Sequence, residues 1–146
     1  MLAAMTTERA KNMMDEGYHC SQVVACHAAE CLGLDKDYMI TISSGFGGGC
    51  NHGDSCGVVI GAILALSLVY GTGHVDEQRD AVMKEKVREF TGKFVAVHKS
   101  TLCRDLLDGY DNADPNRVSK ETTWDNCPGY CHTACEILDE MIGDRY

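Results

Sequence analysis

One segment decides the fold of this chain: residues 55–70, which read SCGVVIGAILALSLVY. Its apolar run, residues 58–70, is apolar on nearly every side, and only Gly61 and Ser67 interrupt it before Gly71. A membrane-spanning helix needs about 20 predominantly apolar residues, so this segment is too short to cross a bilayer. A helix that is apolar all round is buried inside a protein. The sequence therefore predicts a soluble protein with residues 55–70 as its central helix.

Helical patterns flank this central segment, whereas signals for β-strands are weak. Residues 75–100 show the clearest pattern, because their apolar side chains recur in steps of four and three along one helix face. Residues 108–126 contain Pro115 and several Asp and Asn residues, and are expected to form a polar loop. Helices joined by short loops pack as antiparallel bundles. We therefore predict an all-α, single-domain compact helical bundle over residues 1–146, with further helices at about residues 6–16, 19–32, 36–43, 102–107 and 128–142.

The cysteine content is high for a chain of 146 residues, with nine cysteines at positions 20, 26, 31, 50, 56, 103, 127, 131 and 135. A chain of this length buries roughly 70% of the surface that its unfolded form exposes, so it does not need disulfides to fold. An odd number of cysteines would also leave one thiol unpaired. Charged residues between Glu8 and Glu16 interrupt the start of the chain, so we expect no secretory signal peptide. These features predict a cytoplasmic protein whose cysteines rest as thiols.

The charge of the chain excludes one class of partner. The net charge is −9, from 13 basic and 22 acidic residues, and the sequence contains no basic run. Proteins that bind nucleic acids need clustered Lys and Arg side chains to neutralise phosphates. We therefore expect no nucleic-acid partner and, without a membrane-spanning segment, a protein that is not embedded in a membrane.

Four cysteines precede or begin predicted helices. Cys56 follows the capping residues of the central helix, and Cys127 precedes a proline, which is favoured at the first position of a helix. Cys20 and Cys103 fall in the first turns of their predicted helices. Backbone N–H groups and the positive end of the helix dipole favour negative charge at such positions. We therefore expect these four thiols to have a lowered pKa, to be good nucleophiles and metal ligands, and to form one site.

The other five cysteines are less clearly placed. Cys131 lies one turn after Cys127, and its side chain is expected to lean back toward the site as an extra ligand or resolving thiol. Cys50 lies on a glycine-rich loop, six residues before Cys56, and is the second candidate for an extra sulfur. The remaining cysteines are interpreted as packing or flanking residues: Cys26, Cys31 and Cys135. Three histidines lie beside candidate cysteines and are expected to have surface or structural roles: His19, His52 and His132.

Several familiar motifs are absent or incomplete. No Cys-x-x-Cys pair is present, so the sequence predicts neither a thioredoxin motif nor a zinc ribbon. Residues 45–49 are rich in glycine but lack a lysine and follow no strand, so they do not form a nucleotide-binding loop. Residues 108–114 do not match a calcium loop, because Tyr110 stands where an oxygen ligand is needed.

Small residues also recur along one side of the central helix, at Gly57, Gly61 and Ala65. They would allow either another backbone or a bulky cofactor to approach closely, and the sequence leaves both alternatives open.

Residues 44–49 (SGFGGG) and 56–62 (CGVVIGA) together resemble the redox-active proteins named for their C-GCAxxG-C-C cysteine pattern. Members of that family have four characteristic cysteines and a Cys-Gly-Ala-x-x-Gly motif, in which Val58 here replaces the alanine. A similar domain occurs in split-Soret cytochromes, which carry an iron–sulfur centre. This chain lacks Cys-x-x-Cys-His, so the resemblance implies an iron–sulfur cluster without covalent haem. It extends over about residues 18–138, and the residues that match the four cysteines by order and context are Cys20, Cys56, Cys103 and Cys127.

Three functions remain open on this evidence. The first is an iron–sulfur cluster on Cys20, Cys56, Cys103 and Cys127, used for electron transfer or redox sensing. The second is a metal-free thiol–disulfide oxidoreductase or thiol sensor that uses a pair of the same cysteines. The third is a structural zinc site, which is favoured least because zinc ligands usually occur in closely spaced pairs. The expected partner is a redox protein, a small thiol or an oxidant. A homodimer stays open, since the sequence does not tell whether one subunit supplies all the ligands.

Overall fold

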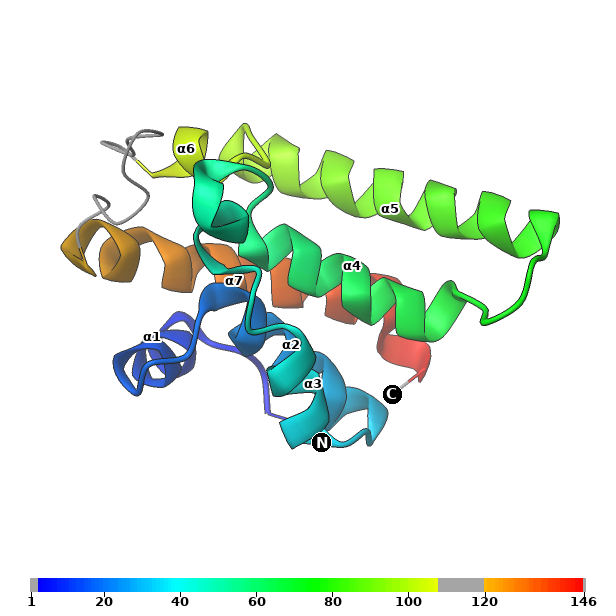
Figure 1. The fold of residues 1–146 in the computed structure, drawn as a ribbon, viewed down its shortest axis with the longest axis horizontal. Coiled ribbons are helices and arrows are strands. Elements are labelled where there is room, and N and C mark those ends of the chain that lie inside the picture. Colours follow the sequence, from blue (N-terminus) through cyan, green and yellow to red (C-terminus); the bar gives the residue numbers. More distant parts are fainter. Residues whose placement is uncertain (1–2, 108–119, 146) are drawn as a thin grey trace.

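Helix α4, Gly57–Tyr70, lies at the centre of the molecule, as its apolar sequence predicts (Figure 1). In the computed structural model, which describes residues 3–107 and 120–145, α4 contacts three other helices. These are α2 (Cys20–Leu32), α5 (Glu77–His98) and α7 (Lys120–Ile142). The side chains of Val58, Ala62 and Leu66 are completely buried among them. The central position of α4 means that its first residues meet the ends of several neighbouring elements.

The remaining elements are short and complete an all-helical architecture. Their bounds are α1 Thr7–Asp15, α3 Lys36–Ile42, the π-helical turn η1 Gly49–Gly53, α6 Cys103–Leu106 and the 3-10 helix η3 Gly143–Arg145. The described residues form no β-strand, and their one β-bridge is the isolated antiparallel bridge between Ser55 and Leu102. The predicted all-α fold is therefore confirmed. No helix in the described part of the chain is long and apolar enough to span a membrane.

The small residues of α4 bring its backbone close to α2. A Cβ atom placed on Gly61 would lie 2.9 Å from the carbonyl oxygen of Ser21 and 3.1 Å from Cβ of Val24. Real Cβ atoms do not tolerate contacts this short, so glycine is needed for the two helices to pack at this distance. Of the two alternatives left open by the sequence, close approach of another backbone is the one observed at Gly61.

Helix α7 begins earlier than predicted. It starts at Lys120 rather than at Pro128, so residues 120–126 of the predicted polar loop are helical and Pro128 lies inside the helix. The prediction was wrong because proline favours the first turn of a helix but is not restricted to it. Cys127 is therefore an interior residue of α7 and not a helix cap. Residues 108–119, which include the stretch compared with calcium loops, lie outside the described residues.

Candidate functional site

The structure brings the four predicted site cysteines together from four different elements. Cys20 is the first residue of α2, Cys56 caps α4, Cys103 is the first residue of α6, and Cys127 lies in α7. Their side chains are between 4% and 7% exposed. The pKa of each of these thiols is raised by the charge of at least one other member of the group, which agrees with sulfurs that lie near one another. We call Cys20, Cys56, Cys103 and Cys127 the four-cysteine site.

Two backbone hydrogen bonds hold Cys56 beside Cys103. The N–H of Cys56 donates to the carbonyl oxygen of Thr101 at 2.7 Å, and the N–H of Cys103 donates to that of Asp54 at 2.8 Å. These bonds flank the antiparallel bridge between Ser55 and Leu102. The pairing joins the segment that enters α4 to the segment that enters α6. It therefore fixes the two cysteines relative to each other.

The glycine-rich loop supplies room and hydrogen-bond donors around Cys20. The Cys20 sulfur accepts hydrogen bonds from the backbone N–H groups of Ser21, Gly48 and Val58. A Cβ atom on Gly57 would lie only 2.8 Å from that sulfur and 2.6 Å from the carbonyl oxygen of Phe46. Glycine after Cys56 is thus required because the sulfur of Cys20 and the loop backbone occupy the space of a side chain.

The loop reaches this position through a left-handed turn. Four consecutive residues have positive φ angles: Gly48 (63°), Gly49 (61°), Cys50 (58°) and Asn51 (60°). Such a conformation costs about 1–2 kcal/mol for each residue that carries a Cβ atom. Glycine avoids this cost, and at position 49 it also avoids a clash, since a Cβ atom there would lie 2.7 Å from Cβ of Cys103.

Two contacts place α7 against the other elements of the site. The hydroxyl of Tyr130 donates to the carbonyl oxygen of Leu106 at 2.7 Å, which ties α7 to α6. The Cys131 thiol lies 3.7 Å from the carbonyl oxygen of Cys20, which ties α7 to the start of α2. Cys127 stands one turn before Cys131, so these contacts hold it at the same end of the bundle.

Burial raises the pKa of these thiols, contrary to the lowered pKa expected at helix starts. It raises the pKa of Cys20 to about 12 and that of Cys56 and Cys103 to about 11, and it also raises the pKa of Cys127. Charge repulsion between neighbouring thiolates adds to this effect in all four cysteines. Backbone N–H groups lower the pKa of Cys20 and Cys56, but they do not outweigh burial. A bound metal ion would reverse this balance, because a coordinating thiol is deprotonated.

The two candidates for an extra sulfur differ in position. Cys131 is completely buried, and burial followed by the charge of Cys20 raises its pKa, so it lies against the four-cysteine site. Cys50 is only partly buried on η1.

The three histidines near these cysteines make surface or structural contacts. His19 and His52 are exposed, while Nδ1 of His132 is hydrogen-bonded to the carbonyl oxygen of Met5 at 2.8 Å.

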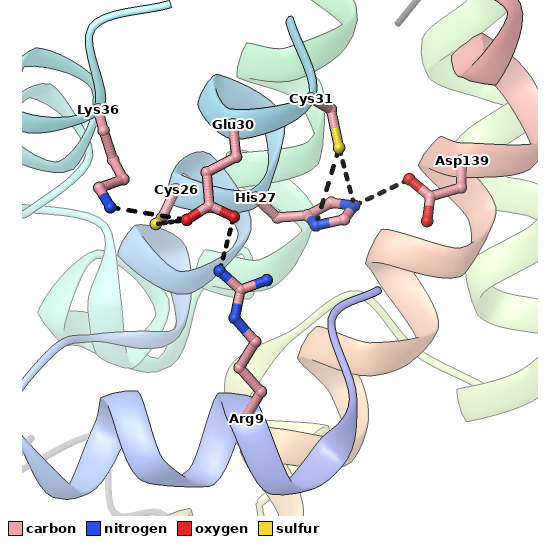
Figure 2. A network of polar contacts seen from close by, with 7 residues as sticks. All are labelled: Arg9, Cys26, His27, Glu30, Cys31, Lys36 and Asp139. Carbon is pink, nitrogen blue, oxygen red and sulfur yellow. Dashed lines mark hydrogen bonds and ion pairs between the residues drawn. The ribbon is translucent and has the colours of Figure 1, made fainter. Parts of the chain in front are cut away.

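A second polar cluster lies farther along α2, and the sequence analysis missed it (Figure 2). His27, which is 1% exposed, is hydrogen-bonded to Asp139 on α7 and lies next to Cys31. Beside it, Arg9 forms an ion pair with Glu30 at 2.6 Å. Burial alone would raise the pKa of Glu30, but the hydrogen bond and charge of Arg9 outweigh it and lower the pKa. The signal that could have revealed the cluster is the spacing of four residues between His27 and Cys31.

A groove elsewhere on the molecule is not associated with these sulfurs. It is lined by the end of α4, the turn that follows and the start of α5, including Ser67, His74 and Arg79. Figure 1 shows this turn at the opposite end of the molecule from α6. The chemistry offered by the cysteines is therefore inside the bundle and not in this groove.

Comparison with known proteins identifies a family for most of the chain. The family model described as "Putative redox-active protein (C_GCAxxG_C_C)" matches residues 18–141. No curated protein and no solved structure matches the chain. The family match includes the glycine-rich loop, the start of α4 and all four cysteines of the site. The chain therefore belongs to the C_GCAxxG_C_C family of redox-active proteins.

Proposed function

We propose that Cys20, Cys56, Cys103 and Cys127 hold an iron–sulfur cluster, and that the protein transfers electrons or senses redox conditions through it. The observation that carries this proposal is the gathering of four buried cysteine sulfurs from α2, α4, α6 and α7. Four cysteine thiolates are the usual ligand set of such clusters. The family's redox-active character agrees with this assignment.

The surroundings of the sulfurs suit a redox centre. A bound cluster would supply one-electron chemistry, with a potential set by hydrogen bonds to sulfur and by solvent exposure. The N–H groups of Gly48 and Val58 donate to Cys20, and those of Val58 and Val59 donate to Cys56. These donors stabilise negative charge on the two sulfurs, and burial keeps water away from them. The left-handed loop and the first turn of α4 would therefore tune the potential.

The spacing of the sulfurs favours a cluster over a single zinc ion. Tetrahedral zinc with Zn–S bonds of about 2.3 Å places its sulfurs about 3.8 Å apart. In the described part of the chain, three ligand atoms lie within 4.8 Å of one another at His27, Cys31 and Asp139, and not among the four cysteines. A cluster spreads its cysteine ligands over several iron atoms and so accommodates wider spacing.

The protonation of the thiols disfavours the metal-free alternative. Thiol–disulfide exchange requires a thiolate that an oxidant or a disulfide can reach. Cys20 and Cys56 have a pKa of about 12 and about 11, so both are protonated near neutral pH. Both are also buried. They are poor nucleophiles in this state, whereas deprotonation by a metal would make them good ligands.

The experiment that tests the proposal is purification without air, followed by an absorption spectrum and by iron and sulfide analysis. We expect visible absorption from sulfur-to-iron charge transfer, and its loss when any cysteine of the site is replaced by serine. The matched control is Cys26→Ser, because Cys26 is another buried cysteine of α2 but lies outside the site. A colourless wild-type protein after reconstitution with iron and sulfide would refute the proposal, as would cluster loss in Cys26→Ser with retention in Cys56→Ser.

A further inference from the structure

A second group of ligand-type side chains lies between α2 and α7 (Figure 2). Nε2 of His27 lies 2.8 Å from a carboxylate oxygen of Asp139 and 3.6 Å from Sγ of Cys31. All three ligand atoms lie within 4.8 Å of one another. Cys31 is about 16 Å farther along α2 than Cys20, from the helical rise per residue. This group is therefore separate from the four-cysteine site.

The geometry of the group does not match a Cys–His–Asp catalytic triad. In a triad, the nucleophile and the carboxylate contact opposite nitrogens of the imidazole ring. Here Asp139 contacts Nε2, whereas Sγ of Cys31 lies 3.6 Å from Nε2 and 4.0 Å from Nδ1 and so does not contact the opposite nitrogen alone. One nitrogen cannot donate a proton to the carboxylate and accept one from the thiol at the same time. The three ligand atoms instead form a group in which all lie within 4.8 Å of one another.

We propose that His27, Cys31 and Asp139 bind a divalent metal ion of borderline softness, for which Zn²⁺ is the best match. Imidazole nitrogen, thiolate sulfur and carboxylate oxygen are all zinc ligands. Tetrahedral zinc places its nitrogen and sulfur ligands about 3.6 Å apart, and its nitrogen and oxygen ligands about 3.4 Å apart. The Nε2–Sγ distance already meets the first value. The hydrogen bond between His27 and Asp139 must lengthen by roughly 0.6 Å to meet the second.

Cys135 is the candidate for a fourth ligand, although its sulfur is not among the atoms that lie within 4.8 Å of one another. It stands one turn before Asp139 on α7, just as His27 stands one turn before Cys31 on α2. Residues four apart share a helix face, so each helix presents two ligand-type side chains. Burial, then the charges of Asp139 and Cys31, raise the pKa of Cys135, which indicates that its sulfur is near both.

The ligand-type side chains differ in exposure, which indicates the side from which an ion would enter. The side chain of Asp139 is 39% exposed, whereas His27 is 1% exposed. An ion would therefore reach the buried donors past Asp139. Once bound, it would link α2 to α7, so the folded state would become more stable as the metal concentration rises above the dissociation constant.

The proposal is tested with Zn²⁺ and Cd²⁺ as probes of the metal-free, reduced protein. Cadmium NMR separates sites by their sulfur content, so an ion bound to His27, Cys31, Cys135 and Asp139 gives a resonance distinct from that of an ion on four thiolates. We expect this mixed-ligand resonance in the wild-type protein, together with a rise in melting temperature when Zn²⁺ is added.

Three variants make the assignment specific. Asp139→Asn and Cys31→Ser should each lose the mixed-ligand resonance and one equivalent of bound Zn²⁺. The control is His132→Gln, which removes a histidine paired with Glu136 four residues later on α7, and it should keep both. Far-ultraviolet circular dichroism of the metal-free variants checks that they are folded, and Asp139→Asn is the conservative change at a half-exposed position.

The possible outcomes distinguish failure of this proposal from failure of the proposed function. Loss of the mixed-ligand resonance in Asp139→Asn and Cys31→Ser alone supports the proposal. Its absence from the wild-type protein, or its survival in both variants, overturns the proposal. Iron and sulfide content, measured on the same variants after cluster reconstitution, reports on the four-cysteine site separately, so failure of one site is distinguishable from failure of the other.

Discussion

Replacing Gly57 with alanine tests whether the start of α4 is shaped by the sulfur of Cys20. The added Cβ atom would lie 2.6 Å from the carbonyl oxygen of Phe46 and 2.8 Å from Sγ of Cys20. Overpacking of this kind costs about 1–3 kcal/mol. Removing the flexibility of glycine from a helix returns about 0.5–1 kcal/mol. We therefore expect Gly57→Ala to lower the free energy of unfolding, by up to about 2.5 kcal/mol.

The matched control is Gly92→Ala. Gly92 lies within α5, and a Cβ atom there would have no neighbour within 4 Å. This variant should raise the free energy of unfolding by about 0.5–1 kcal/mol. Urea unfolding of the metal-free proteins measures both changes, and iron content after reconstitution should fall in Gly57→Ala alone. If Gly57→Ala were as stable as Gly92→Ala and bound the same amount of iron, the steric reasoning would be refuted.

Three further predictions follow from the burial and protonation of the cysteines. Brief alkylation of the metal-free protein at neutral pH should modify the partly exposed Cys50 before Cys56, which is 4% exposed, and peptide mass mapping reports the order. Binding of iron to the four-cysteine site should release about one proton per ligand thiol, because ligands must deprotonate. A pH indicator dye measures the release when Fe²⁺ is added to the metal-free protein near neutral pH, and a release equal to that of Cys56→Ser would contradict this prediction. The free energy of unfolding of the metal-free protein should fall as the pH rises above 9.0, the ordinary cysteine value, toward the pKa of about 12 for Cys20. The unfolded chain then releases thiol protons that the folded chain retains, so higher pH favours unfolding; constant stability between pH 9 and 11 would count against this protonation scheme.

The fold was predictable because apolar patterning reports directly on burial. Residues 57–70 are apolar on nearly all sides and form the central helix, and the glycines at positions 57 and 61 mark places where neighbouring atoms leave no room for a Cβ atom. The α7 boundary was not predictable in the same way. The local preference of Pro128 for a helix start is weaker than the tertiary contacts that hold a longer helix against α1, α2, α4 and α5.

The gathering of the four cysteines at one end of the bundle was predictable, but their electrostatics were not. Helix starts identified Cys20, Cys56 and Cys103. Cys127 was chosen because α7 was expected to begin at Pro128, but α7 begins earlier, at Lys120. The direction of the pKa shifts depends on how deeply the thiols are buried and on their distances from one another, and neither can be read from spacing along the chain. His27 and Asp139 were missed for a related reason. They are 112 residues apart, and only the packing of α2 on α7 brings them together.

The antiparallel bridge at Ser55 and Leu102 has a consequence for the order of folding. The ion pair between Arg104 and Asp54, beside this bridge, joins residues 50 positions apart, and the contact between Cys131 and Cys20 joins residues 111 positions apart. Contacts between residues so distant along the chain require large loops to close, which slows their formation. The four sulfurs can therefore meet only after α7 has docked, near the end of folding. In a nascent chain the four cysteines would be far apart. A metal centre on them would therefore assemble only in the completed bundle.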